Sequence, residues 1–226
     1  GSSLELRLSY FRPNLKMLRE IFSIGISAFF RQAGSGLVAG IRNNLLVAHG
    51  GSMFISAFGA VFRLIMFLGM PGMGIAQALQ PIAGYNYGAG KISRVRRSLW
   101  VSIGACTLFM CIGFGITQLF PGELLRLFSS DDSLSAEGIP IMRYSAFLFI
   151  VFPAYMLAPS FYQAIGKPGR AFFLSLTRPI SGIVLMLICV RAFGVMGVVA
   201  ADPIAVTIGA VAAILYLRSS LKKLTL

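Results

Sequence analysis

The sequence is short of charged residues, and of acidic residues above all. Only 12% of its 226 residues are charged, and the Asp and Glu residues number seven. An average soluble domain carries about 25% charged residues. A soluble domain of this size cannot bury so much apolar surface, because its own exterior needs polar cover. The composition therefore excludes an ordinary soluble enzyme.

The residues that build most enzyme and metal sites are also scarce. His49 is the single histidine, and no serine or cysteine nucleophile pairs with it in a recognisable pattern. The three cysteines have no metal-ligand spacing and lie inside apolar runs, at Cys106, Cys111 and Cys189. We therefore expect no catalytic residues, no metal site and no cofactor.

What the sequence has instead is long apolar runs. Hydrophobic residues make up 57% of the chain, and the mean hydropathy is +0.82. Six runs are long enough to cross a bilayer, for which about 20 helical residues suffice: 21–48, 54–82, 99–120, 139–165, 171–193 and 195–217. Open strands would leave backbone groups unpaired in lipid, and no alternating pattern of a barrel recurs. The sequence predicts an all-α polytopic membrane protein with one six-helix bundle.

The expected domains follow from these runs. We interpret residues 1–20 as a tag remnant (Gly1–Ser3) followed by a cytoplasmic amphipathic connector. Residues 21–217 form the six-helix transmembrane lobe, and residues 218–226 form a basic cytoplasmic tail.

Positive charge dominates the loops on one side of the predicted bundle. The chain has 20 Lys and Arg residues and a net charge of +13, which in a soluble protein suggests nucleic acid as a partner. Here the basic residues lie between apolar runs, mainly before residue 20, at 91–97, at 167–170 and after 217. Basic loops mark the cytoplasmic side. We expect a multi-pass protein of the cell membrane with both termini in the cytoplasm and no nucleic-acid partner.

Charges also occur inside the predicted spans. An ionised side chain at mid-membrane costs about 2.5–3.5 kcal/mol on insertion scales, so it faces a cavity, a partner or water. Arginines in the spans outnumber acids. Asp202 is the one acid well within a span, with Glu20 at one margin, against four arginines: Arg31, Arg42, Arg63 and Arg178. We hypothesise that a partner half supplies the missing negative charge.

The first span carries a polar face. Ser27, Arg31, Ser35, Val38 and Arg42 follow helical spacing, which favours a face lining an aqueous cleft. The alternative is that Arg42 snorkels to the outer interface and that Arg31 is satisfied locally.

Small residues and prolines also mark the spans. Gly36 and Gly40 have the G-x-x-x-G spacing that lets helices approach closely, which favours packing over a dimer contact. Prolines inside the spans kink helices and either shape a cavity or serve packing.

Three stretches together carry a family resemblance. Residues 74–97 read GIAQALQPIAGYNYGAGKISRVRR, residues 162–170 read YQAIGKPGR, and residues 193–203 read FGVMGVVAADP. The first is no phosphate-binding loop, because Tyr85 and Ile92 stand where that motif needs Gly and Ser or Thr. In content and spacing the three resemble the C-terminal half of the multidrug and toxic compound extrusion family.

The resemblance implies one lobe of a twelve-helix, pseudo-twofold secondary antiporter. Such a transporter exports small organic, often cationic compounds in exchange for H+ or Na+. Its partners would be the lipid bilayer and the N-terminal half of the same transporter or a second copy. The alternatives are an isolated non-transporting module, a homodimeric half-transporter, or a relative that flips lipid-linked precursors.

The same resemblance suggests which residues face the substrate. The expected wall is built from the first, second and fourth spans, where aromatic and Met side chains suit promiscuous apolar ligands. The candidates are Phe29, Arg31, Gln32, Asn43, Arg63, Met66, Tyr155 and Tyr162. The acids that bind a coupling ion in this half of some family members are missing here. Asp202 is the remaining candidate for that role, with pairing to Arg178 as the alternative.

Overall fold

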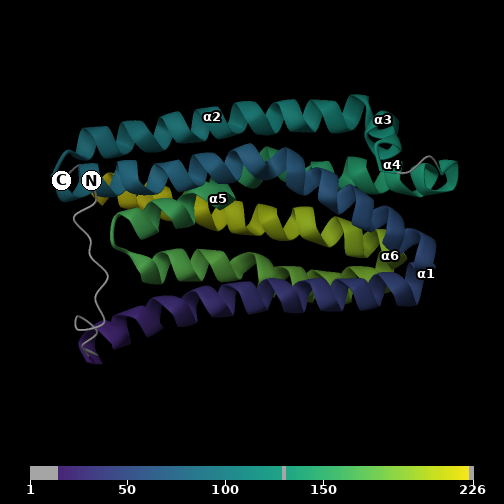
Figure 1. Ribbon diagram of the computed structural model, residues 1–226, viewed down its shortest axis with the longest axis horizontal. Helices are drawn as coiled ribbons and strands as arrows, with labels where there is room; N and C mark the ends of the chain where they lie inside the picture. The colour runs from purple at the N-terminus through teal and green to yellow at the C-terminus, as the bar shows by residue number, and fades with distance from the viewer. Residues whose placement is uncertain (1–14, 129–130, 224–226) are drawn as a thin grey trace, which may run out of the picture.

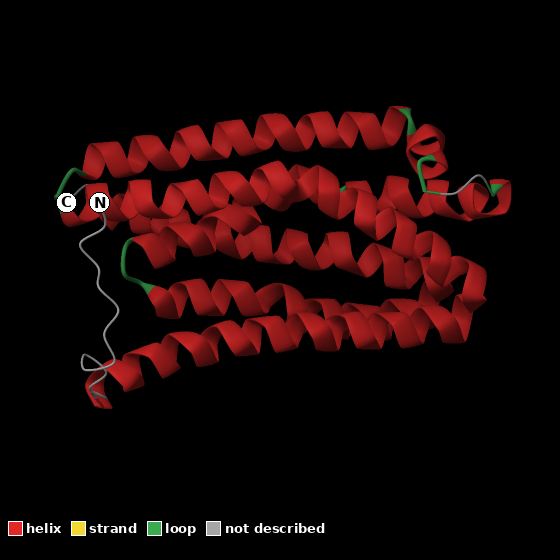
Figure 2. Cartoon of the chain, in the orientation of Figure 1, coloured by secondary structure: helices red, strands yellow, loops and turns green. Residues whose placement is uncertain are grey.

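The computed structural model describes residues 15–128 and 131–223, and every regular element in these ranges is a helix (Figures 1 and 2). The helices are α1 (Leu15–Gly88), α2 (Ile92–Leu119), α3 (Pro121–Arg126), α4 (Asp132–Ala146), α5 (Leu148–Ala164) and α6 (Pro168–Lys223).

The two longest helices each double back at a glycine. α1 reverses at Gly51, with φ 73° and ψ −175°, and α6 reverses at Gly194, with φ 58° and ψ −140°. Only glycine adopts such backbone angles without a steric penalty. Figure 1 shows both reversals at the same end of the molecule. Each long helix is therefore a hairpin of two crossings.

The remaining crossings are α2 and the bent pair α4–α5. Among the described residues, three helices are long and apolar enough to span a membrane, and α4 with α5 passes the same test as one span bent by 47°. Since α1 and α6 each contain a reversal, residues 15–128 and 131–223 make six crossings. The predicted all-α, six-helix fold is confirmed.

Two local features differ from the expected spans. The fourth predicted span is not one straight helix, because it breaks at Phe147 between α4 and α5. The short helix α3 was not expected and begins with Pro121 at its first position, where the missing proline N–H costs nothing. Asp131 then caps α4 by accepting a hydrogen bond from the Ser133 N–H, at 2.9 Å.

The helix α5 forms the centre of the bundle. It packs against α1, α2 and α6, and Leu157, Ala158, Phe161 and Tyr162 are fully buried on it. Large apolar side chains on the outside remain exposed, as expected for a surface that meets lipid or another protein.

The two ends of the bundle separate the loops by charge. The turn from α1 to α2, the turn from α5 to α6 and the end of α6 lie at one end (Figure 1). Lys91, Lys167 and Arg218 all belong to this end. The two glycine reversals and the α3–α4 region, which holds Glu123 and Asp132, lie at the other.

Candidate functional site

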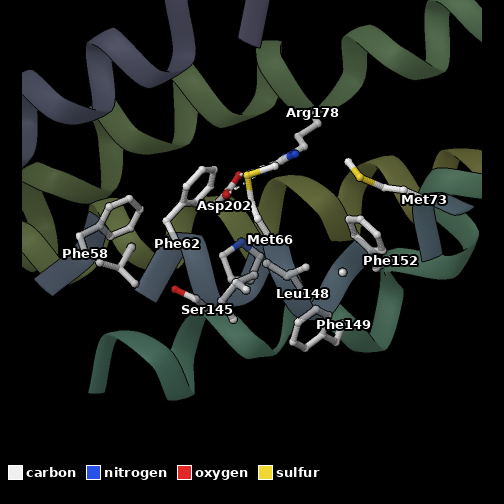
Figure 3. Close-up of a pocket in the computed structure, with 14 residues that line it drawn as sticks. Phe58, Phe62, Met66, Met73, Ser145, Leu148, Phe149, Phe152, Arg178 and Asp202 are labelled. Carbon is white, nitrogen blue, oxygen red and sulfur yellow. Dashed lines mark hydrogen bonds and ion pairs between the residues drawn. The ribbon is translucent and has the colours of Figure 1, made fainter. Parts of the chain in front are cut away.

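A pocket inside the bundle lies between the second half of α1, the α4–α5 bend and α6. Its volume is about 100 Å³. Figure 3 shows the side chains that converge on it. The lining is mainly aromatic and Met, with one charged pair: Phe58, Phe62, Ile65, Met66, Gly69, Met73, Ser145, Leu148, Phe149, Phe152, Arg178, Val199, Asp202 and Pro203.

The charged pair in the wall is a bidentate salt bridge within α6. Arg178 Nη2 donates to Asp202 Oδ2 at 2.9 Å and to Oδ1 at 3.0 Å, and Arg178 Nε donates to Oδ1 at 3.1 Å. The Asp202 side chain is 13% exposed and that of Arg178 is 33% exposed. Such paired N–H···O bonds between ionised groups are the strong, geometrically fixed kind.

Arg42, from the first half of α1, completes the cluster. Its Nη1 lies 3.4 Å from Asp202 Oδ2, and its side chain is 7% exposed. Its guanidinium carbon lies 5.2 Å from the centre of the Phe58 ring and 4.9 Å from that of Phe62. Those distances allow a cation–π attraction with both rings. Arg42 Nε has no hydrogen-bond partner among the described residues.

The cluster carries a surplus positive charge, because two guanidiniums share one carboxylate. No other acid whose side chain the structure describes lies near it, since Glu123, Asp131, Asp132 and Glu137 are all exposed at the α3–α4 end. Arg178 also lies within hydrogen-bonding reach of the Tyr155 side chain. The interior of the described bundle is therefore electropositive at this point.

Prolines mark the two positions on α6 that carry the pair. Pro179 directly follows Arg178, and Pro203 directly follows Asp202. A proline within a helix removes a backbone hydrogen bond and kinks the helix. Asp202 lies eight residues after the reversal at Gly194, so a rise of about 1.5 Å per residue places it roughly 12 Å below the turn. The cluster is thus well inside the bundle.

The structure brings some predicted site residues to this pocket and leaves others elsewhere. Met66 and Asp202 line it, and Tyr155 contacts Arg178 beside it. Arg63 is exposed and lies in a separate surface hollow with Phe128. Asn43 is exposed. The side chains of Phe29, Arg31 and Gln32 lie outside the described residues.

Tyr162 lies at the other end of the bundle, in a polar cluster of its own. It is fully buried, and its hydroxyl lies 2.8 Å from Ser220 Oγ. Arg170 Nη1 donates to the same Ser220 oxygen at 2.6 Å, and the Arg170 guanidinium lies over the Tyr162 ring at 5.7 Å. These contacts join α5 to both ends of α6. The Tyr162 side chain is fully buried among its neighbours. It therefore does not line the pocket.

The structure also bears on two further expectations, one about the position of Arg42 and one about the packing of Gly36 and Gly40. Arg42 does not snorkel to the outer interface but points into the bundle. At Gly36 and Gly40 on α1, an added Cβ would meet no atom of the described residues within 4 Å. The face of α1 that carries them is available to lipid or to another chain.

Asp202 is poorly placed to hold a coupling cation in this arrangement. Both its oxygens accept from Arg178, and Oδ2 also faces Arg42. Among the described residues, no three His, Cys, Asp or Glu side chains gather as metal ligands would. The arrangement provides an apolar cavity whose edge is positively charged at Arg178.

Sequence reasoning did not find the pocket walls contributed by Phe58, Phe62 and Phe152 or the meeting of Arg42 with Asp202. One signal was present in the sequence. Arg178 and Asp202 each precede a proline in a mid-span position, where a kink leaves room for a polar side chain.

Comparisons with known proteins identify a family model that matches the chain and several relatives that it resembles over nearly its whole length. The family model described as MatE matches residues 37–188. The multidrug export protein MepA of Staphylococcus saprophyticus is 27% identical over 222 residues, which are 98% of this chain and 49% of that protein. MepA of Staphylococcus aureus strain MRSA252 is 28% identical over 226 residues, 99% of this chain and 49% of that protein. The chain spans about half the length of these curated relatives.

Solved structures of transporters are likewise matched over about half of their length. An outward-facing multidrug resistance MATE family transporter of the MOP superfamily superposes with a TM-score of 0.86 at 20% identity, over 98% of this chain and 50% of that one. An inward-facing structure of such a transporter also gives 0.86 at 20% identity, over 97% of this chain and 51% of that one. The matched halves of these two transporters therefore share the fold of this chain.

Proposed function

Since the chain belongs to the MatE family, we propose that it is the C-terminal lobe of a secondary multidrug exporter. The observation that carries the proposal is the proportion of the match: 98% of this chain superposes on half of an outward-facing transporter. A second lobe, either an N-terminal half or another copy of this chain, would complete the protein. The substrates would be small organic, often cationic compounds.

The size of the internal pocket supports the need for a second lobe. Sites for drug-sized ligands measure about 300–1,000 Å³, whereas this pocket measures about 100 Å³. A larger substrate would have to bind between this lobe and its partner. The exposed face around Gly36 and Gly40 offers a surface on which helices can approach closely.

The match to both conformations supports a rigid-body mechanism. The TM-score is 0.86 for the outward-facing and for the inward-facing transporter. A lobe that fits both states equally well changes little inside, so alternating access would come from rocking one lobe against the other. The basic end of the bundle would face the cytoplasm, together with both termini.

Export would be driven by H+ or Na+. The coupling cation would bind in the partner lobe, because the one carboxylate inside the described part of this lobe already holds Arg178 and faces Arg42. Asp202 would then serve as a structural anion that keeps two arginines in place.

The test is ethidium efflux from drug-susceptible bacterial cells. Cells express this chain alone, the N-terminal half of Staphylococcus aureus MepA alone, or both together. The proposal expects efflux above background only when both are present, and its collapse when the cation gradient is dissipated. Efflux by this chain alone would favour a homodimeric half-transporter. Absence of efflux in all three, with both chains shown to be in the membrane, would favour a non-transporting module.

A further inference from the structure

The internal pocket combines an apolar lining with uncompensated positive charge. Arg42 and Arg178 share Asp202, and the other acids whose side chains the structure describes are exposed at the α3–α4 end of the bundle. A buried charge without a counter-charge is unfavourable in a medium of low polarity. A bound anion would neutralise the cluster.

The two arginines differ in how they face the pocket. Arg178 lines the pocket and is the more exposed of the two, at 33% against 7% for Arg42. Arg42 lies behind the wall, against the faces of Phe58 and Phe62, and its Nε has no described partner. Arg178 is thus the group that a ligand would touch, while Arg42 adds positive potential from behind.

The rest of the lining selects an apolar body on that ligand. Phe58, Phe62, Met66, Met73 and Phe152 surround the space next to Arg178 (Figure 3). Aromatic and thioether side chains favour contacts with flat apolar groups. A volume of about 100 Å³ suits a single ring or a short chain rather than a multi-ring compound.

We propose that the pocket between α1, the α4–α5 bend and α6 binds a small organic monoanion, such as an aromatic carboxylate, with its carboxylate beside Arg178 and its ring among Phe62, Met66 and Phe152. An organic cation of the same shape is disfavoured there, because both oxygens of Asp202 are already taken by arginines. The site is formed by residues of this lobe alone, and its occupation does not require transport.

The direct test compares two probes that differ in the sign of their charge. Binding of 4-fluorobenzoate and of 4-fluorobenzylammonium to the purified chain is followed by fluorine NMR. The non-ionic maltoside micelle contains no lipid phosphate to compete, and empty micelles give the background. We expect the carboxylate to bind at least about ten-fold more tightly, because a hydrogen bond to a charged group typically separates binders by that factor or more. Equal or tighter binding of the ammonium, or no binding of either probe, would overturn the proposal.

Variants locate the site. Arg178→Gln removes the cation in the wall and should weaken 4-fluorobenzoate binding by about ten-fold or more. Arg178→Lys keeps the charge and should keep the preference for the anion. Arg191→Gln is the matched control, since Arg191 is exposed beside the turn of α6 and should bind like the wild type. Unchanged binding in Arg178→Gln, or equal loss in Arg191→Gln, would refute the assignment.

The folding of each variant is checked by its thermal unfolding midpoint. If Arg178→Gln does not fold, the probe preference of the wild type and of Arg178→Lys still decides the question. Loss of the preference in a folded Arg178→Lys would overturn the proposal that the positive charge at this position selects the anion. Transport plays no part in these measurements, so a failed efflux experiment and a failed binding experiment are distinguishable.

Discussion

Removing the Asp202 carboxylate should destabilise the lobe more than any other loss of a single charge in its described part. Asp202→Asn keeps the shape of the side chain but replaces three short hydrogen bonds to Arg178 and the contact with Arg42 by at most a neutral amide. The net charge of the Arg42, Arg178 and residue 202 cluster then rises from +1 to +2. Breaking a buried ion pair by removing one partner costs about 3–5 kcal/mol.

A double-mutant cycle separates the interaction from the cost of each substitution. Arg178→Gln alone leaves Asp202 with Arg42, at 3.4 Å, so it should cost less than Asp202→Asn. In the double variant the carboxylate and its main partner are both gone. Because the two side chains touch, we expect a coupling energy of at least about 1.5 kcal/mol.

Each variant is unfolded in mixed maltoside–dodecyl sulfate micelles, and its loss of helix is followed by far-ultraviolet circular dichroism. The free energy of unfolding of each variant is obtained from this transition. The matched control is Asp132→Asn. Asp132 lies 3.9 Å from Arg126, but the two side chains are 93% and 72% exposed, and an exposed pair contributes about 0–1 kcal/mol. Additive effects of Asp202→Asn and Arg178→Gln, within about 0.5 kcal/mol, would refute the interpretation of the cluster as one buried unit.

Three further predictions concern packing, the basic-end cluster and pH. Gly197→Ala should lower the free energy of unfolding by about 1–3 kcal/mol, because the added Cβ would overlap the Cys189 carbonyl. The control Gly40→Ala has open space around its Cβ and should be neutral or stabilising in the same assay. An unchanged free energy of unfolding in Gly197→Ala would contradict the close approach of the two halves of α6. Tyr162→Phe removes the hydrogen bond to Ser220 but keeps the buried ring, so it should lower the free energy of unfolding by about 0.5–1.5 kcal/mol. The affinity for 4-fluorobenzoate should stay unchanged, and an altered affinity would show that Tyr162 reaches the pocket. The hydrogen bonds from the Ser133 side chain and backbone lower the pKa of Asp131, so its cap on α4 should persist from neutral pH down to its ordinary pKa of about 4 and weaken only below that. Protection factors of the first α4 amides, corrected for intrinsic exchange at each pH, that fall between pH 8 and 5 would contradict this sign.

The sequence by itself determined the class of the protein and the number of crossings. Each span is a run of apolar residues long enough for the bilayer, and a helix in lipid satisfies its own backbone, so neither property depends on distant contacts. The reversals were equally local, because Gly51 and Gly194 interrupt the runs where positive φ is needed. The grouping of basic residues at one end follows from the same count of crossings.

Only the tertiary structure decided which side chains meet. Asp202 lies 24 residues from Arg178 and 160 from Arg42, and their contact depends on how each helix is rotated and kinked. Tyr162 shows the converse, since its aromatic ring fits a cavity wall by residue type and instead packs against Ser220. Helix formation is a property of consecutive residues, whereas the azimuth of a helix is set by packing against its neighbours, and that is why the charge inventory was readable in advance and the positive pocket was not.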